Sequence, residues 1–528
     1  MMRLKNWSLL HPILLAIFPA LQYYAANSSE ALLINVLVPI LFSVTLMGIV
    51  WLILKILIKD KFRSALITSS LLLLFFSYQH LSGFVYNQRE VFPAITKPLA
   101  ENSFFIYIIF LILLGLLVRK VANQRRAAGF LTILGAYLVV SSIIRIIPIE
   151  IARAKSATNL VSLRSDEVEK ELENVPQAKT RPDVYYIVPD RYANNTTLKE
   201  FYHYDNSDFT NFLKDNGFYI AEQSTTNYPK TFLSLASSLN LQHITQLSEL
   251  IGRDVADNTP VFTMVQNNML SEFFQKQGYE FVYFGSWWEP TRINRHADLN
   301  INLYADSDEF LRKFGQTTAL NPILNEIFNK GDILGFSDER VRDNHQYQFA
   351  ELKKIAAHKS PKFVFVHMLI PHSPYVLDRN CQPVDDKEDG KDIKGYNEQL
   401  ICVNNQFKEV ITAILKNSKT PPIIVIQSDE GPFKVDEMNR HGEGINWRKT
   451  SSEAARIHMR IFNAYHLPGF DTSQLYQSVT PVNSFRLILN HYFDTKFPLL
   501  PDKNYYIPHL NNPYDFYEVT DIVDFNEK

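Results

Sequence analysis

The distribution of apolar residues divides the chain into two parts. Five long apolar segments fill most of the first 150 residues: roughly Ser8–Ala26, Ala31–Ile58, Ser64–Tyr86, Phe104–Val118 and Ala127–Ile149. A membrane-spanning helix needs about 20 mainly apolar residues. A cleavable signal peptide would account for the first segment only. The pattern therefore predicts a membrane domain of about five transmembrane helices over residues 1–150.

Basic residues alternate between the loops that join these segments. They lie before the first segment, between the second and third, and between the fourth and fifth: Arg3, Lys5, Lys59, Lys61, Arg63, Arg119, Lys120, Arg125 and Arg126. Such loops normally stay in the cytoplasm. We therefore expect a multi-pass protein of the inner or plasma membrane, with everything after Ile149 on the other side. Polar residues inside the segments are few, so a transporter is the weakest alternative.

The pattern changes after a polar stretch at 151–181, which is interpreted as a juxtamembrane linker with a short helix at Val168–Asn174. From Pro182, short apolar runs alternate with helical periodicity. The runs are Val184–Val188, Glu280–Phe284, Phe363–His367, Ile423–Ile426 and Ile461–Tyr465, and the helical stretches include Leu198–Asn216 and Asn404–Leu415. This alternation predicts an α/β domain with a mostly parallel central sheet over residues 182–528.

Composition narrows the function classes. The chain has 528 residues, too many for one ordinary core, and its net charge of −2 without a basic block in the second half argues against nucleic acid as a partner. Two cysteines form neither a disulfide scaffold nor a zinc cage. An oxidising compartment permits a bridge between Cys381 and Cys402, worth about 3 kcal/mol. The alternative, that Cys402 is simply buried on a helix, stays open.

Acidic residues follow two of the predicted strands directly. Asp190 comes after Val184–Val188, and Asp429 and Glu430 come after Ile423–Ile426. Open α/β sheets bind ligands at the carboxyl ends of their strands. These carboxylates are therefore candidate ligand-binding residues, although Asp429 would also serve as an ordinary helix N-cap.

A threonine and two histidines add further candidate chemistry. Pro229 precludes a helix before Thr231, and the apolar residues that follow predict a helix starting at about Thr231. A hydroxyl at a helix N-terminus is well placed to hold an anion, although an N-cap role explains it equally. His367 ends a predicted strand, and prolines on both sides keep His372 in extended backbone, as suits an anion contact.

Taken in order, four stretches resemble the sulfatase-like branch of the alkaline phosphatase superfamily. They are PDVYYIVPDRYA at 182–193, NYPKTFLSLASSLN at 227–240, VHMLIPHSPY at 366–375 and IIVIQSDEGP at 423–432. The chain looks most like the membrane-anchored lipoteichoic acid synthases and phosphoethanolamine transferases. The similarity covers most of residues 182–506.

The resemblance implies a metal-dependent transfer or hydrolysis of a phosphate or sulfate ester on an envelope lipid or glycan. It implies Thr231 as the nucleophile and a divalent cation on Asp190, Thr231 and Asp429, and it places Lys230, His367 and His372 at the substrate. Neither cysteine lies in the C/S-x-P-x-R run of sulfatases proper, which favours phosphoryl transfer.

The chain departs from the family at one position of the site. The family has histidine where this chain has Glu430, and we expect Glu430 to be the remaining metal ligand. An all-oxygen site favours Mn, Mg or Ca over Zn. The departure also supports an alternative, in which the domain is a non-catalytic glycan-binding or envelope-assembly protein.

Overall fold

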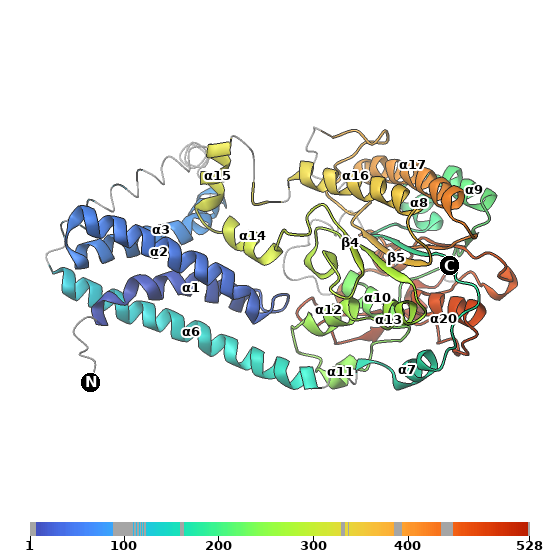
Figure 1. Cartoon of the computed structure of the whole chain (residues 1–528), viewed down its shortest axis with the longest axis horizontal. Coiled ribbons are helices and arrows are strands. Elements are labelled where there is room, and N and C mark those ends of the chain that lie inside the picture. Colours follow the sequence, from blue (N-terminus) through green and yellow to red (C-terminus); the bar gives the residue numbers. More distant parts are fainter. Residues whose placement is uncertain are drawn as a thin grey trace. The chain divides into compact units, whose positions relative to one another are not determined.

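The chain forms two compact units in the computed structural model, shown in Figure 1. The structure describes residues 7–87, 123–158, 163–328, 333–335, 337–384, 393–433 and 447–525, and the isolated residues 109, 112, 116, 118 and 120. One unit comprises Met1–Lys155 with Ser307–Ser337, and the other comprises Ser156–Asp306 with Asp338–Lys528. We call them the helical unit and the α/β unit.

The helical unit contains the N-terminal apolar segments. Its helices are η1 (Trp7–Leu9), α1 (His11–Ala26), η2 (Leu33–Val36), α2 (Leu37–Ile58), α3 (Lys61–Asn87), α6 (Gln124–Thr158), α14 (Glu309–Gln316) and α15 (Leu320–Phe328). Among the described residues, three of its helical stretches are long and apolar enough to cross a membrane: Leu33–Ile58, Lys61–Phe84 and Gln124–Ala154. The first expected span corresponds to α1, which has 16 residues. The fourth, Phe104–Val118, lies almost entirely outside the described residues.

The α/β unit is built around a seven-stranded sheet of order β2-β7-β6-β1-β5-β3-β4. The strands are β1 (Val184–Pro189), β2 (Tyr219–Ile220), β3 (Glu280–Phe284), β4 (Leu299–Ile301), β5 (Lys362–Met368), β6 (Ile423–Gln427) and β7 (Asn463–His466). Strands β4, β3, β5, β1 and β6 pair in parallel, and β7 is antiparallel to both neighbours. The expected mostly parallel sheet is confirmed, and all five predicted strands are present.

Helices cover both faces of this sheet. They are α7 (Asp166–Glu173), α8 (Asn195–Phe201), α9 (Ser207–Asp215), α10 (Thr231–Ser238), α11 (Leu247–Leu250), α12 (Thr259–Gln266), α13 (Met269–Lys276), α16 (Asp338–Ile355), α17 (Ile393–Asn417), α19 (Ser452–Met459), α20 (Pro481–Tyr492) and α21 (Thr520–Val523). Short 3-10 turns are η4 (Glu289–Thr291), η5 (Trp447–Lys449) and η6 (Thr472–Gln474), and β8 (Tyr505–Tyr506) pairs with β9 (Tyr517–Glu518). Figure 1 shows α16 and α17 on one side of the sheet and α10, α12, α13 and α20 on the other.

Alternation along the central strand explains the two covered faces. Val184, Tyr186 and Val188 of β1 pack into the main core together with residues of α10, α12, α13 and α20. Tyr185 and Ile187 point to the opposite face and are equally buried. A strand buried on both faces reads as a continuous apolar run, which is why these strands stood out in the sequence.

Two helical predictions need adjustment. The single helix expected at Leu198–Asn216 is wrong, because the chain forms α8 and α9, and between them His203 adopts a positive φ of 52°. The short helix expected at Val168–Asn174 is confirmed as α7, which begins two residues earlier because Ser165 caps it. Part of the segment interpreted as a linker therefore belongs to the core, where Val168 and Leu172 of α7 are buried.

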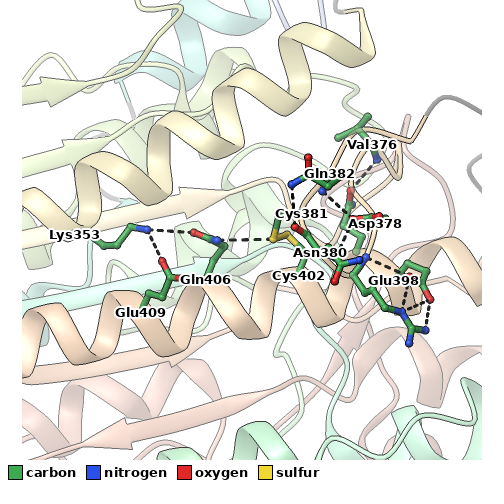
Figure 2. The surroundings of a disulfide bond; sticks show 12 residues. Lys353, Val376, Asp378, Asn380, Cys381, Gln382, Glu398, Cys402, Gln406 and Glu409 are labelled. Carbon is green, nitrogen blue, oxygen red and sulfur yellow. Dashed lines mark hydrogen bonds and ion pairs between the residues drawn. A yellow bond between two sulfur atoms is a disulfide. The ribbon is translucent and has the colours of Figure 1, made fainter.

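Cys381 and Cys402 form a disulfide with a Cα–Cα distance of 5.1 Å (Figure 2). Cys402 lies on α17, and Cys381 lies in a turn in which Asp378 accepts backbone hydrogen bonds from Asn380 and Gln382. The bridge that the sequence left open is thus present. It fastens the segment after β5 to a helix that covers the sheet.

Candidate active site

The candidate site lies where three adjacent parallel strands end. The sheet order places β1 between β6 and β5, with Val188 beside His367 and Ile187 beside Ile426. Asp190 follows β1 directly, and Asp429 follows β6 after one serine. Open sheets place their ligands at this edge.

Asp190, His367 and Asp429 converge at this edge. One potential ligand atom from each lies within 4.8 Å of the others, and all three residues are buried. Several of their polar atoms are buried and have no hydrogen-bond partner among the described residues: Asp190 Oδ1, both carboxylate oxygens of Asp429, and His367 Nε2. Unpaired buried acceptors are costly unless something compensates them. Two carboxylates and one imidazole nitrogen therefore fit a divalent cation.

The orientation of the His367 ring is fixed from behind. Its Nδ1 lies 2.8 Å from Thr291 Oγ1, which in turn lies 2.7 Å from Ser286 Oγ. Gln348 Nε2 donates to the His367 backbone carbonyl at 3.0 Å. Nδ1 is thereby hydrogen-bonded, and Nε2 is left on the side of the two carboxylates. A metal-binding histidine is usually held in this way, by a hydrogen bond at the nitrogen that does not bind the metal. Burial lowers the pKa of His367 to about 3, so the ring is neutral at pH 7.

The two aspartates carry the electrostatic signature of a crowded acidic site. Burial first, and the Asp429 charge second, raise the pKa of Asp190 well above its ordinary value. Burial and then Glu430 raise the pKa of Asp429 to about 7, while the neighbouring Thr231 side chain lowers it. Perturbed groups of this kind cluster at functional sites.

Thr231 is the first residue of α10, as predicted. Lys230 before it has extended backbone (φ −137°, ψ 137°), and its carbonyl accepts from the N–H groups of Leu233 and Ser234. The Thr231 hydroxyl therefore stands at a helix N-terminus beside Asp429, where the helix dipole favours negative charge.

Glu430 is held in a separate group of charges. Its carboxylate lies 3.4 Å from Arg191 Nε and 3.3 Å from His458 Nε2. Burial would raise the pKa of Glu430, but Lys230, His458 and Arg191 hold it below its ordinary value. The ligand-like trio contains His367 and not Glu430. Burial lowers the pKa of His458 to about 4, so Arg191 is the cation of these two neighbours. The metal-ligand role of Glu430 therefore stays a prediction, and the structure instead pairs this carboxylate with Arg191.

Arg191, His458 and Phe433 are members of the site that the sequence did not single out. Arg191 and Lys230 both lie over the Phe433 ring, with 4.3 and 4.7 Å to its centroid. His458 lies in the last turn of α19, and its ring centroid lies 4.3 Å from that of Phe433. The sequence does offer a signal for Arg191, because this residue directly follows the candidate ligand Asp190. His458 carries no sequence signal, since it joins the site only through the fold.

His372 lies between two cis peptide bonds, Ile370–Pro371 and Ser373–Pro374. Its Nδ1 contacts the Ser373 carbonyl. Burial and then the charge of Arg191 lower the pKa of His372 well below its ordinary value. His372 is thus close enough to the cationic group to feel its field, and its substrate contact stays a prediction.

The sulfatase family profile matches residues 194–487, which is more than half of the chain. The chain belongs to the sulfatase family. This sulfatase-family chain is thus a sulfatase-like member of the alkaline phosphatase superfamily, as its motifs indicated. No curated protein sequence matches it.

Several solved structures resemble this sulfatase-family chain at low identity. The C-terminal periplasmic domain of EptC from Escherichia coli is 12% identical, with a TM-score of 0.40, and the match covers 64% of this chain and 94% of that one. The corresponding domain of phosphoethanolamine transferase EptC from Campylobacter jejuni is 14% identical, with a TM-score of 0.38 and coverages of 64% and 97%. The soluble domain of lipooligosaccharide phosphoethanolamine transferase A from Neisseria meningitidis is 14% identical, with a TM-score of 0.38 and coverages of 60% and 89%.

Proposed function

We propose that this protein is a membrane-anchored enzyme that transfers or hydrolyses a phosphate or sulfate ester of an envelope lipid or glycan. Thr231 is the nucleophile, and the domain works outside the cytoplasm. The observation that carries the proposal is the buried trio Asp190, His367 and Asp429, whose unpaired ligand atoms lie beside a hydroxyl at a helix N-terminus.

Asp190, Asp429 and His367 Nε2 would hold a divalent cation, with the Thr231 hydroxyl as a further oxygen ligand. Such a cation lowers the pKa of a bound hydroxyl and screens an incoming anion. Oxygen ligands outnumber the single imidazole, so we expect Mn, Mg or Ca to be preferred over Zn. Sulfatase-family membership supports a cation at this site.

The remaining residues act on the substrate anion. Lys230 and Arg191, both over the Phe433 ring, supply positive charge next to Thr231. The Thr231 oxygen attacks the phosphorus or sulfur, a new O–P or O–S bond forms, and the bond to the leaving alcohol breaks. Water or an acceptor hydroxyl then displaces the group from Thr231. His372 would contact the anion oxygens.

The covalent step gives a direct test. Reconstituted full-length protein incubated with a phosphate-ester substrate should show a phosphoryl group on the peptide that contains Thr231, by mass spectrometry. Thr231→Ala should lack this adduct and lose turnover by about 10⁴-fold or more, the order seen when a nucleophile is removed. Ser234→Ala is the matched control, because the Ser234 hydroxyl faces Thr226 inside the core.

Two other outcomes would redirect the proposal. Full turnover in Thr231→Ala would exclude this nucleophile. Absence of any turnover, together with binding of an envelope glycan, would support the non-catalytic alternative, for which Glu430 at the usual histidine position is the argument. A reporter fused after Lys155 tests the location, and a cytoplasmic signal there would contradict it.

A further inference from the structure

The segment between β4 and α16 interrupts the sequence of the α/β unit but packs as part of the helical unit. Residues Ser307–Ser337, which contain α14 and α15, cluster with Met1–Lys155. Asp308 caps α14 by accepting from the Leu311 N–H. The outer domain predicted over residues 182–528 includes this segment.

Aromatic packing holds α14 against the N-terminal helices. Phe310 and Phe314 are buried in the same cluster as residues of α1, α2 and α3. The ring of Phe310 lies 5.1 Å from that of Tyr23, and the ring of Phe314 lies 6.0 Å from that of Phe76. Leu311 and the Lys313 side chain are exposed, and Lys313 pairs with the buried Glu309. One face of this helix is therefore committed to the apolar helices.

Main-chain hydrogen bonds join the next residues to α3. The Ala319 N–H donates to the Phe75 carbonyl at 2.9 Å, and the Gln79 N–H donates to the Thr317 carbonyl at 3.3 Å. Ala319 and the partly buried Ile323 of α15 pack with Leu74 and Tyr78. The turn between α14 and α15 is thus hydrogen-bonded to α3, a helix long and apolar enough to cross a membrane.

The free end of α15 is strongly apolar. Ile327 is 67% exposed and Phe328 is 60% exposed. Among the described residues, every large hydrophobic side chain exposed by 60% or more belongs to the helical unit, and the others lie on the N-terminal apolar helices and the segments that adjoin them. The α/β unit buries its apolar residues as a water-soluble domain does. The end of α15 instead exposes large apolar side chains, as do the N-terminal helices that we propose to lie in the membrane.

We propose that α14 and α15 form an interfacial membrane element, with Ile327 and Phe328 in contact with bilayer lipid. This inference rests on the membrane location in the proposed function. Amphipathic helices bind at the bilayer surface in this way, with their apolar residues at the headgroup–acyl boundary. The chain would therefore enter the membrane region a second time, from within the catalytic sequence.

Site-directed spin labelling in liposomes tests this, because both native cysteines form the disulfide. Labels are placed at Phe328→Cys and, independently, at Ile327→Cys. Collision with oxygen reports lipid, and collision with a water-soluble nickel complex reports water. Leu41→Cys on α2, where the native side chain is 68% exposed, is the lipid reference, and Lys214→Cys on α9 is the aqueous reference.

The expected result is oxygen-dominated collision at 327, 328 and 41, and nickel-dominated collision at 214. Nickel-dominated collision at 327 and 328, with position 41 in lipid, would overturn this inference and leave the proposed membrane location intact. Exclusion of both reagents at 327 and 328 would also overturn it, because a protein partner or a second copy would then cover the helix end. Position 41 in water would contradict the membrane location itself.

Discussion

Arg191 Nε lies 3.4 Å from Glu430 Oε1, in a buried group that also contains His458. The Ser428 hydroxyl fixes this arrangement, since it donates to the Glu430 carbonyl at 2.7 Å and accepts from the Tyr192 N–H at 3.0 Å. The residue at the family's usual histidine position is therefore anchored to the loop that follows β1.

Removing the Glu430 carboxylate tests whether this residue serves as an ion-pair partner or as a metal ligand. Glu430→Ala leaves Arg191 without its buried counter-charge, so we expect a loss of about 3 kcal/mol in unfolding free energy. The loss should be seen by chemical denaturation in a chelating buffer, where no cation contributes. A variant that is stable in chelator but binds cations poorly would instead support Glu430 as a ligand.

Divalent cations should stabilise the wild-type fold by mass action. At a cation concentration 100 times the Kd, the gain is about 2.7 kcal/mol, measured as a shift in melting temperature. Mn, Mg or Ca should act more strongly than Zn, and Glu430→His should move the preference towards Zn, because imidazole is a good zinc ligand. Asp190→Asn should remove the effect. If no cation shifts the wild-type melting temperature, the metal site is refuted.

Thr291 should position His367 for the cation. Thr291→Val removes the hydroxyl beside His367 Nδ1, and loss of such outer partners typically weakens metal binding by about 10–100-fold. Titration calorimetry measures the change. Thr263→Val is the control, since that exposed hydroxyl donates only to the Thr259 carbonyl. Equal affinities in Thr291→Val and wild type would argue that His367 is not a ligand.

The Cys381–Cys402 disulfide closes a loop with a sequence separation of 21. A loop of that size should contribute on the order of 3 kcal/mol in the chain-entropy account. Replacing both cysteines by serine should lower the unfolding free energy by that amount, and a reducing agent should lower it in wild type but not in the variant. A double variant as stable as the oxidised wild type would contradict this.

His345 on α16 should make the fold acid-sensitive. Burial lowers its pKa to about 4, so the folded protein resists the proton that the unfolded chain accepts near pH 6.5. The neutral His345 therefore contributes about 3 kcal/mol to the unfolding free energy above pH 6.5, and this contribution is lost as the pH falls towards 4. His345→Leu should flatten this part of the stability profile, whereas His296→Gln, at an exposed position, should not.

The sequence predicted the parts of the structure that depend on continuous apolar runs. Strands β1, β5 and β6 are buried on both faces, so their positions and the acids that follow them were visible before any fold was known. Helix α10 was predicted at its first residue, because Pro229 excludes an earlier start.

Features created by long-range contacts could not be predicted in the same way. His367 resembles an ordinary core histidine until the sheet order brings it beside Asp190 and Asp429. His458 reaches Glu430 across a long-range contact, in which Gly431 lies so close to the backbone carbonyls of Ile457 and His458 that a side chain there would clash. Helices α14 and α15 have eight and nine residues, and nothing in their periodicity distinguishes a helix that packs on the N-terminal bundle from one that packs on the sheet.

The placement of Ser307–Ser337 also determines how the α/β unit can be produced by itself. A fragment cut after Lys155 would retain this segment but lose its packing partners, so Phe310 and Phe314 would face water. Such a fragment should aggregate. Replacing 307–337 with a short glycine–serine connection should give a monodisperse α/β fragment, because the sheet and its covering helices lie in the sequence on either side.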